Sequence, residues 1–194
     1  MINVTIGKEQ MRDRKMKWIC LFLIIIALPV HADQSSGTAS KFSVGPDSYC
    51  VVAATRDQIF IELRSYTADR LLEDVALLSR YMEPEYEIAD VVLDQHEEVI
   101  VRTRGGGTGI HETHLEVFGF LSDRIVRLGD FIIDRSLVEE NREELRSGTV
   151  SFREKNVLVY RYRDSVIEGG KTIAKDTVET YRFDPKSMRY EFQR

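Results

Sequence analysis

The chain has 194 residues, of which 43% are hydrophobic and 30% charged, and its net charge at pH 7 is −5. This acidic balance argues against a nucleic-acid partner and against an anionic membrane surface, because no excess of Lys and Arg is available to attract phosphates.

Residues 1–32 have the pattern of a cleaved secretory signal peptide. The basic segment Arg12–Lys17 precedes the apolar run Trp18–Val30, which is shorter than the roughly 20 residues that a membrane-spanning helix needs. Met11 would give the signal a more usual start than Met1 does. We therefore expect a periplasmic or secreted protein whose only membrane contact is through this segment before cleavage.

The mature chain would begin at Asp33, and its 162 residues suit one domain. Removing residues 1–32 takes away five Lys/Arg and two Asp/Glu, so the net charge becomes −8. We expect a flexible leader over 33–40 and a single β-rich domain over 41–194. Cys50 is the one cysteine left, and its apolar surroundings in the sequence predict a buried small hydrophobic residue. A redox-active or intermolecular role is the alternative.

The first strands are short and separated by turn residues. Lys41–Val44 is expected to be an edge strand, Tyr49–Thr55 and Gln58–Tyr66 to form a hairpin, and Tyr86–Leu93 to be a further strand. Asp94–Glu97 is a polar turn into the next element.

The segment Thr67–Met82 fits two structures. Its apolar residues have the spacing of a helix, which Thr67 would cap and Pro84 would end. We favour a strand over Leu71–Leu78, because the similar segment Ile125–Ile133 has a clearer β composition.

The stretch Glu98–Arg135 is the centre of the predicted fold. Val99, Val101 and Thr103 share one face of a strand, and their neighbours point the other way. The following strand, Leu115–Leu121, is apolar on both faces, so we expect it to be covered on both sides. The third strand is Ile125–Ile133. The glycine-rich run Gly105–Gly109 is expected to be a loop between the first two strands.

The remainder of the chain is predicted to alternate irregular segments with strands. Ser136–Ser147 is charged and would form one or two helical turns or a loop. Ile167–Lys175 would be a mobile hairpin loop with Gly169 and Gly170 at its tip. The strands are Thr149–Phe152, Val157–Arg163, Thr177–Phe183 and Met188–Phe192.

Parts of the sequence resemble one another. Ile61–Arg80 aligns with Leu115–Arg135 with one single-residue gap, and Val178–Tyr190 aligns with part of both. A spacing of about 50–60 residues is typical of repeat arrays. We therefore predict an all-β antiparallel meander of about 10–12 strands in three repeated units, built as propeller-like blades, an up-and-down barrel or a two-sheet sandwich. Open edges would favour a homo-oligomer or a cap.

The segment Ala89–Val101 reads ADVVLDQHEEVIV. Asp90-Val91 and Glu98–Val101 fit the frame of an Asp-rich loop that runs into Glu-Leu-Val-Val, so the segment resembles an FG-GAP or VCBS-type β-propeller repeat. Gln95–Glu97 stands where the family has the glycines and aspartates of a calcium loop, so calcium binding is not carried over. The resemblance implies an extracellular binding scaffold and no activity.

The run His111-Glu112-Thr113-His114 contains metal-ligand types. Its spacing differs from the i, i+4 of a helical site, and in a strand the two histidines face opposite sides. Only a loop would bring them together, with His96 or Glu98 as a third ligand. We expect no metal, with a site on His111, His114 and His96 as the alternative.

A second candidate site surrounds the glycine run. Gly105, Gly106 and Gly107 lack the spacing of a phosphate loop or a dinucleotide fingerprint. Arg102 and Arg104 flank them, and with His111 and His114 they would favour a carboxylate or sulfate if they converge.

These features predict an exported, non-catalytic binding or interaction module without a cofactor. The partner would be an unknown protein or small-molecule ligand, and not a nucleic acid. One alternative is a metal-binding protein or hydrolase that uses the loop with His111 and His114. The other is an inhibitor of a periplasmic enzyme.

Overall fold

A computed structural model describes residues 39–92, 96–121, 123–153 and 156–193. These residues form twelve strands, all paired antiparallel, and none of them lies in a helix that could cross a membrane. The predicted all-β class and strand number are confirmed. The predicted signal peptide over 1–32 lies outside the described residues.

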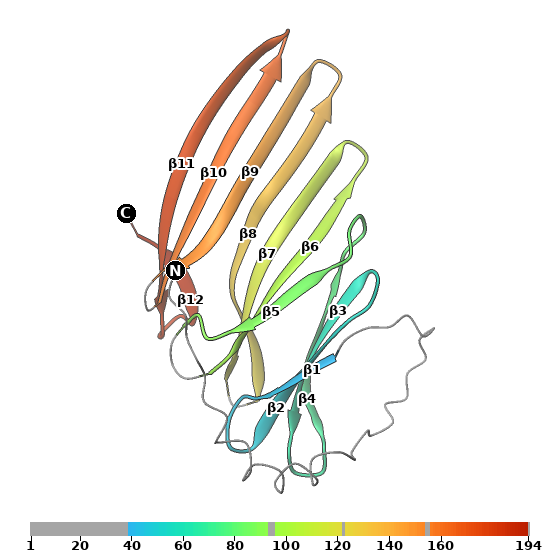
Figure 1. Cartoon of the computed structure of the whole chain (residues 1–194), viewed down its shortest axis with the longest axis vertical. Coiled ribbons are helices and arrows are strands. Elements are labelled where there is room, and N and C mark those ends of the chain that lie inside the picture. Colours follow the sequence, from blue (N-terminus) through green and yellow to red (C-terminus); the bar gives the residue numbers. More distant parts are fainter. Residues whose placement is uncertain (1–38, 93–95, 122, 154–155, 194) are drawn as a thin grey trace, which may run out of the picture. The chain divides into compact units, whose positions relative to one another are not determined.

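The first four strands form one sheet in the order β1-β2-β3-β4 (Figure 1). They are β1 (Ala39–Ser43), β2 (Ser48–Ala54), β3 (Gln58–Ser65) and β4 (Leu71–Leu78). The strand that we favoured over Leu71–Leu78 is confirmed. Its side chains alternate between half-buried and exposed, because β3 pairs with it and places Val75 and Leu77 on the core.

The other eight strands form a second sheet in the order β12-β11-β10-β9-β8-β7-β6-β5. Their bounds are β5 (Glu85–Ala89), β6 (Glu98–Gly107), β7 (Ile110–Leu121), β8 (Arg124–Glu139), β9 (Arg142–Arg153), β10 (Val157–Glu168), β11 (Lys171–Asp184) and β12 (Arg189–Phe192). Because β5 and β12 end the sheet, it does not close into a barrel. The second and third predicted units share this sheet and do not form separate blades.

The predicted pairing of Leu115–Leu121 with Ile125–Ile133 is confirmed by the β7–β8 register. The aligned hairpins β3–β4 and β7–β8 lie in different sheets. The internal repeat stays a prediction.

Two hydrophobic cores lie on the two faces of β6 and β7. On one face Val99, Val101 and Phe118 pack against the four-stranded sheet, around residues such as Val52 and Ile61. On the other face a second cluster joins β6–β8 to β9–β12; it includes Ile100, Leu115, Val117, Phe131, Leu158, Tyr160, Phe183 and Tyr190. The expectation that Leu115–Leu121 is covered on both sides is therefore confirmed.

Three segments that were predicted to be irregular are largely strands, and these predictions are wrong in that respect, although the predicted hairpin tip at Gly169 and Gly170 is confirmed. Ser136–Ser147 forms the hairpin of β8 and β9, and Ile167–Lys175 forms that of β10 and β11, which stays paired up to Glu168 and Lys171. Gly105–Gly107 continues β6. In the first two segments neither core covers the strands, so their apolar residues do not follow a period of two and no apolar pattern marks them as β.

The ends of β8–β11 extend beyond both cores (Figure 1). We call this part the distal sheet; it comprises Asp134–Glu139, Arg142–Ser147, Arg163–Glu168 and Lys171–Val178. All of its residues are exposed or half-buried, and none belongs to either core cluster. Within the described part of the chain, the distal sheet is therefore a single layer.

The predicted buried position of Cys50 is confirmed, since the residue is fully buried. Burial, and secondarily the charge of Glu62, raises the pKa of its thiol to about 12.

At pH 8 we expect Cys50 to react with an aromatic disulfide on the order of 1,000-fold more slowly than a free cysteine, because the thiolate is the nucleophile. The Cys50→Ser chain reports the contribution of Cys20, and unfolding in urea should remove the protection. Fast labelling of Cys50 in the folded chain would contradict this.

Candidate functional site

The glycine run is part of the β6–β7 hairpin. Gly106 pairs with His111 and Gly107 with Ile110, so the hairpin turns at Thr108 and Gly109. Gly106 has φ of 141°, and a Cβ there would lie 2.1 Å from the carbonyl oxygen of Ile110. The hairpin therefore needs glycine at this position for its own geometry.

His111 and His114 lie on opposite faces of β7. His111 pairs with Gly106 and contacts the edge of Tyr81, with ring centroids 4.9 Å apart. His114 pairs with Thr103 on the other face. Both histidines lie in a strand, so the loop that a shared metal site would require is not formed. Within the described ranges no three His, Cys, Asp or Glu side chains are grouped so that they could hold a metal ion.

The two arginines of the candidate site share the face of His111 but have different surroundings. Arg102 is exposed and forms an ion pair with Glu85 at 3.2 Å. Arg104 is half-buried, and its backbone N–H donates to Ser79 Oγ at 3.0 Å. The seven predicted site residues are thus neighbours in one hairpin, but His114 lies on the face opposite to Arg102, Arg104 and His111.

Glu98, which we considered as a metal ligand, has a structural position. Its side chain is 3% exposed and accepts hydrogen bonds from the backbone N–H groups of Val91 (2.8 Å) and Val92 (3.3 Å). It therefore holds the start of the connection between β5 and β6.

The structure reveals a charged cluster that we did not predict. On the His114 face, Arg127 contacts Glu116 at 2.7 Å and Asp130 at 3.4 Å. His114 bridges Asp130 and Glu112, and Arg135 lies 3.3 Å from Glu112.

The charges continue across the distal sheet. The strand register aligns Glu112, Arg135, Arg146, Asp164 and Lys175 in one row, which we call the ionic row. Arg146 donates two hydrogen bonds to Asp164, at 2.7 and 2.9 Å, and lies over the ring of Tyr162. These bonds raise the pKa of the Arg146 guanidinium. The residues of the ionic row are far apart in the sequence, so only the strand register could have revealed that they lie side by side.

His114 binds its proton more strongly than a free histidine. Its Nδ1 lies 2.9 Å from Asp130 Oδ1, and its Nε2 lies 3.5 Å from Glu112 Oε2. The hydrogen bond with Asp130 is the main cause that raises the pKa of His114 above its ordinary value of 6.5; partial burial opposes it and Glu112 adds to it. The same bond lowers the pKa of Asp130.

We expect His114→Gln to lower the free energy of unfolding more at pH 5 than at pH 8. Because the folded-state pKa of His114 is raised, its stabilising contribution is complete below the unfolded pKa and is lost as pH rises through the folded pKa. The contribution of Asp130, whose pKa is lowered, disappears as pH falls through its folded value. The expected difference is only about 0.5–1 kcal/mol, because solvent screens these half-exposed groups.

Urea unfolding at both pH values measures this difference. His111→Gln, on the opposite face of β7, is the matched control for the loss of an imidazole from this strand. An equal loss for His114→Gln at pH 5 and pH 8 would count against the assignment.

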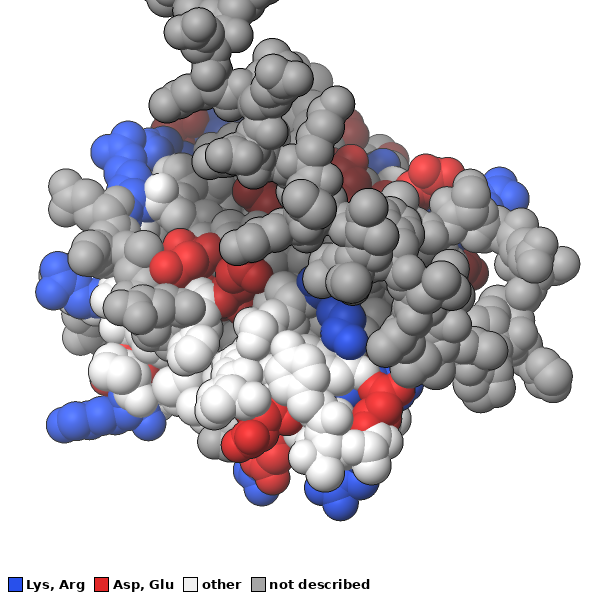
Figure 2. Space-filling model, turned by 60° about the horizontal axis from the view of Figure 1, so that its bottom comes forward, with Lys and Arg blue, Asp and Glu red and all other residues white. Residues whose placement is uncertain are grey.

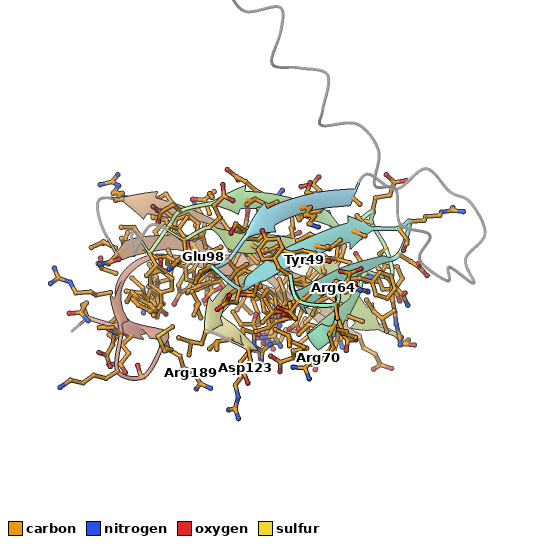
Figure 3. The ribbon with its side chains drawn as sticks, turned by 90° about the horizontal axis from the view of Figure 1, so that it is seen from below. Tyr49, Arg64, Arg70, Glu98, Asp123 and Arg189 are labelled. Atoms are coloured by element: carbon orange, nitrogen blue, oxygen red, sulfur yellow. The ribbon has the colours of Figure 1, made fainter. Side chains whose placement is uncertain are left out.

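The β3–β4 turn carries a second polar cluster. Tyr49 donates a hydrogen bond to Asp69, and Arg64 lies 3.8 Å from Asp69 and 2.8 Å from Glu62. Figure 3 shows Tyr49 and Arg64 on the four-stranded sheet, where they are paired in the β2–β3 register. Each of these polar groups has a partner within the sheet, so the cluster has a structural role.

Charge is mixed on the part of the surface that can be viewed in Figure 2. On the face shown in Figure 2, acidic and basic side chains are interspersed, and the Lys and Arg side chains that are drawn do not merge into one patch.

Comparison with known proteins finds no family model that matches the chain, and no curated protein or solved structure with significant similarity to it.

Proposed function

We propose that this protein is an exported, non-catalytic module that binds another protein through its distal sheet. The signal-peptide pattern of residues 1–32 supports export to the periplasm or the outside of the cell. The observation that carries the proposal is the single-layer structure of the ends of β8–β11.

Both cores are complete without the distal sheet. Ordering each of its residues costs about 1–2 kcal/mol of backbone entropy. Among the described residues, no fully buried side chain of the distal sheet helps to offset that cost. Several large apolar side chains there are exposed, including Val138 (56%), Ile173 (73%) and Val178 (62%). A bound partner that covers this layer would bury them.

The two faces of the distal sheet differ in chemistry. One face carries the ionic row, whose members all have charged side chains. On the other, the register aligns Ser136, Leu145, Ser165 and Ala174 in a row of small or uncharged residues that begins at His111. We call it the small-residue face. Around this row the same face also carries Glu143, Arg163 and Asp176, and the last two form an ion pair at 4.0 Å. The uncharged row and the exposed Val138 and Val178 beside it offer a partner an apolar contact area, which favours this face as the contact surface.

Capture of partners from envelope extract on the immobilised chain tests the proposal. Ser165→Arg places a long charged side chain in the middle of the small-residue face and should reduce capture about tenfold or more, by analogy with a charge placed in a binding hot spot. Asp57→Arg, in the exposed β2–β3 turn, is the matched control and should capture as the unmodified chain does. Capture that survives Ser165→Arg, or that Asp57→Arg abolishes, would overturn the proposal.

The alternative, a metal-binding protein or hydrolase, requires a different arrangement of side chains. It needs His111, His114 and His96 to converge, and β7 holds the first two on opposite faces. Zinc titration by calorimetry, with the double variant His111→Gln/His114→Gln as control, tests it. A stoichiometric heat that the double variant lacks would favour this alternative over the binding module.

A further inference from the structure

We infer that the outer edge of β11 binds an extended strand of a partner protein in antiparallel orientation, and that this strand carries acidic, apolar and acidic residues in alternation on one face. The inference rests on the proposed function and assigns it a specific edge.

The backbone of β11 has hydrogen-bonding groups that face outward. β12 pairs with β11 only from Tyr181 to Asp184. Among the residues that the structure describes, 171–179 therefore pair on one side, with β10. Phe183 N–H donates to Asn156 on the β10 side, whereas the carbonyl of Thr180 accepts from Gln193 on the outer side. Because these directions alternate along a strand, the N–H and C=O groups of Thr172, Ala174, Asp176 and Val178 point outward.

This edge has neither a bulge nor a proline against strand addition, and the charges of Lys171 and Lys175 are its one protection in this segment. Its register with β10 is continuous from Lys171 to Arg182, without a bulge, and the segment contains no proline. Ile173 and Val178 are the two most exposed large apolar side chains of the described residues. Such an edge is a template for another strand.

The side chains along the edge specify the chemistry of that strand. Lys171, Ile173 and Lys175 alternate on the face of the ionic row, and within the described ranges neither lysine forms an ion pair. A shallow pocket of about 360 Å³ lies on this face, lined by Val166, Glu168, Gly169, Lys171 and Ile173. Opposite-charge and apolar cross-strand pairs stabilise a sheet. An acidic residue is therefore expected opposite each lysine, and an apolar residue opposite Ile173.

A second copy of the chain fits this edge less well. Antiparallel pairing about a two-fold axis places one residue opposite its own copy. If the axis passes through Lys175 or Asp176, that residue lies opposite its own copy and like charges meet. If it passes through Ala174, Ile173 of one copy lies opposite Lys175 of the other. Centres nearer the carboxyl end bring the second strand against β12, which occupies the edge from Tyr181.

The test uses the purified chain and a labelled peptide, Val-Thr-Lys-Glu-Val-Val-Thr-Glu, with binding measured by fluorescence anisotropy. Aligned antiparallel, its two glutamates lie opposite Lys175 and Lys171. Ala174→Pro removes an outward N–H and leaves the bonds to β10, because proline is tolerated at an outward-facing edge position. We expect it to weaken binding about fivefold or more relative to the control Ala174→Thr, as one hydrogen bond is lost.

Charge reversal supplies a second test that does not depend on proline. The double substitution Lys171→Glu/Lys175→Glu should lower the affinity for the peptide about tenfold. A peptide with lysine in place of both glutamates should restore binding to this doubly substituted chain. Methylating the peptide nitrogens that face β11 should abolish binding, whereas methylating those that face away should not.

Equal affinity of Ala174→Pro and Ala174→Thr, or charge reversal without effect, would overturn the inference. So would a dimer, seen by sedimentation, that Ala174→Pro dissociates, since the occupant would then be a second copy. If the peptide fails to bind while Ser165→Arg still reduces capture, the edge is wrong and the proposed function stands. If the control chain Asp57→Arg no longer captures partners from envelope extract, the proposed function is wrong whatever the peptide result.

Discussion

Leu158→Ala should lower the free energy of unfolding by about 2–5 kcal/mol, because it leaves a cavity in a packed core. Leu158 lies on β10, is 0% exposed and belongs to the cluster that joins β9–β12 to β6–β8. The other side of that cluster includes Val117 and Phe131. The loss should therefore weaken the contact between the two halves of the eight-stranded sheet.

Urea unfolding followed by far-ultraviolet circular dichroism measures this change. Ile173→Ala removes an apolar side chain that is 73% exposed, and it should stay within about 0.5 kcal/mol of the unmodified chain. Equal effects of the two substitutions would show that the cluster around Leu158 is not packed as described. Faster hydrogen exchange in the distal sheet alone would also contradict the expected weakening of the contact between the two halves of the eight-stranded sheet.

Glu98→Ala should cost about 2–4 kcal/mol, because it leaves the backbone N–H groups of Val91 and Val92 without their buried acceptor. Glu98 is 3% exposed, and both hydrogen bonds reach the same carboxylate oxygen. Tyr190 also reaches this connection, through a 3.2 Å hydrogen bond from its hydroxyl to the carbonyl of Val91. The expected result is local as well as global: the amides of Val91 and Val92 should exchange rapidly with solvent.

Glu98→Gln is the matched control for this prediction. It keeps a side-chain oxygen that can accept the same hydrogen bonds and removes only the charge, so we expect a smaller loss than for alanine. Glu97→Ala, at an exposed neighbour, should have little effect. A Glu98→Ala chain that unfolds at the same urea concentration as the unmodified chain would refute the structural role of this carboxylate.

The candidate site shows which inferences from spacing succeed. Two histidines three residues apart in a strand must face opposite sides, and His111 and His114 do so. The surroundings of each could not be predicted, because Tyr81 and Asp130 come from other strands or loops. The ionic row escaped prediction for the same reason, since Arg146 and Asp164 meet only through the β9–β10 register.

The sequence by itself determined the β class, the consecutive antiparallel pairing and the burial of Cys50, because period-two alternation and apolar runs record which residues meet a core. Only the tertiary structure decided that Ser136–Ser147 and Ile167–Lys175 are strands. Their backbone hydrogen bonds come from neighbouring strands, and a layer without a core imposes no apolar pattern on its sequence. The outer edge of β11 could not be predicted either, because only the strand order shows that no described strand pairs with residues 171–179 on that side.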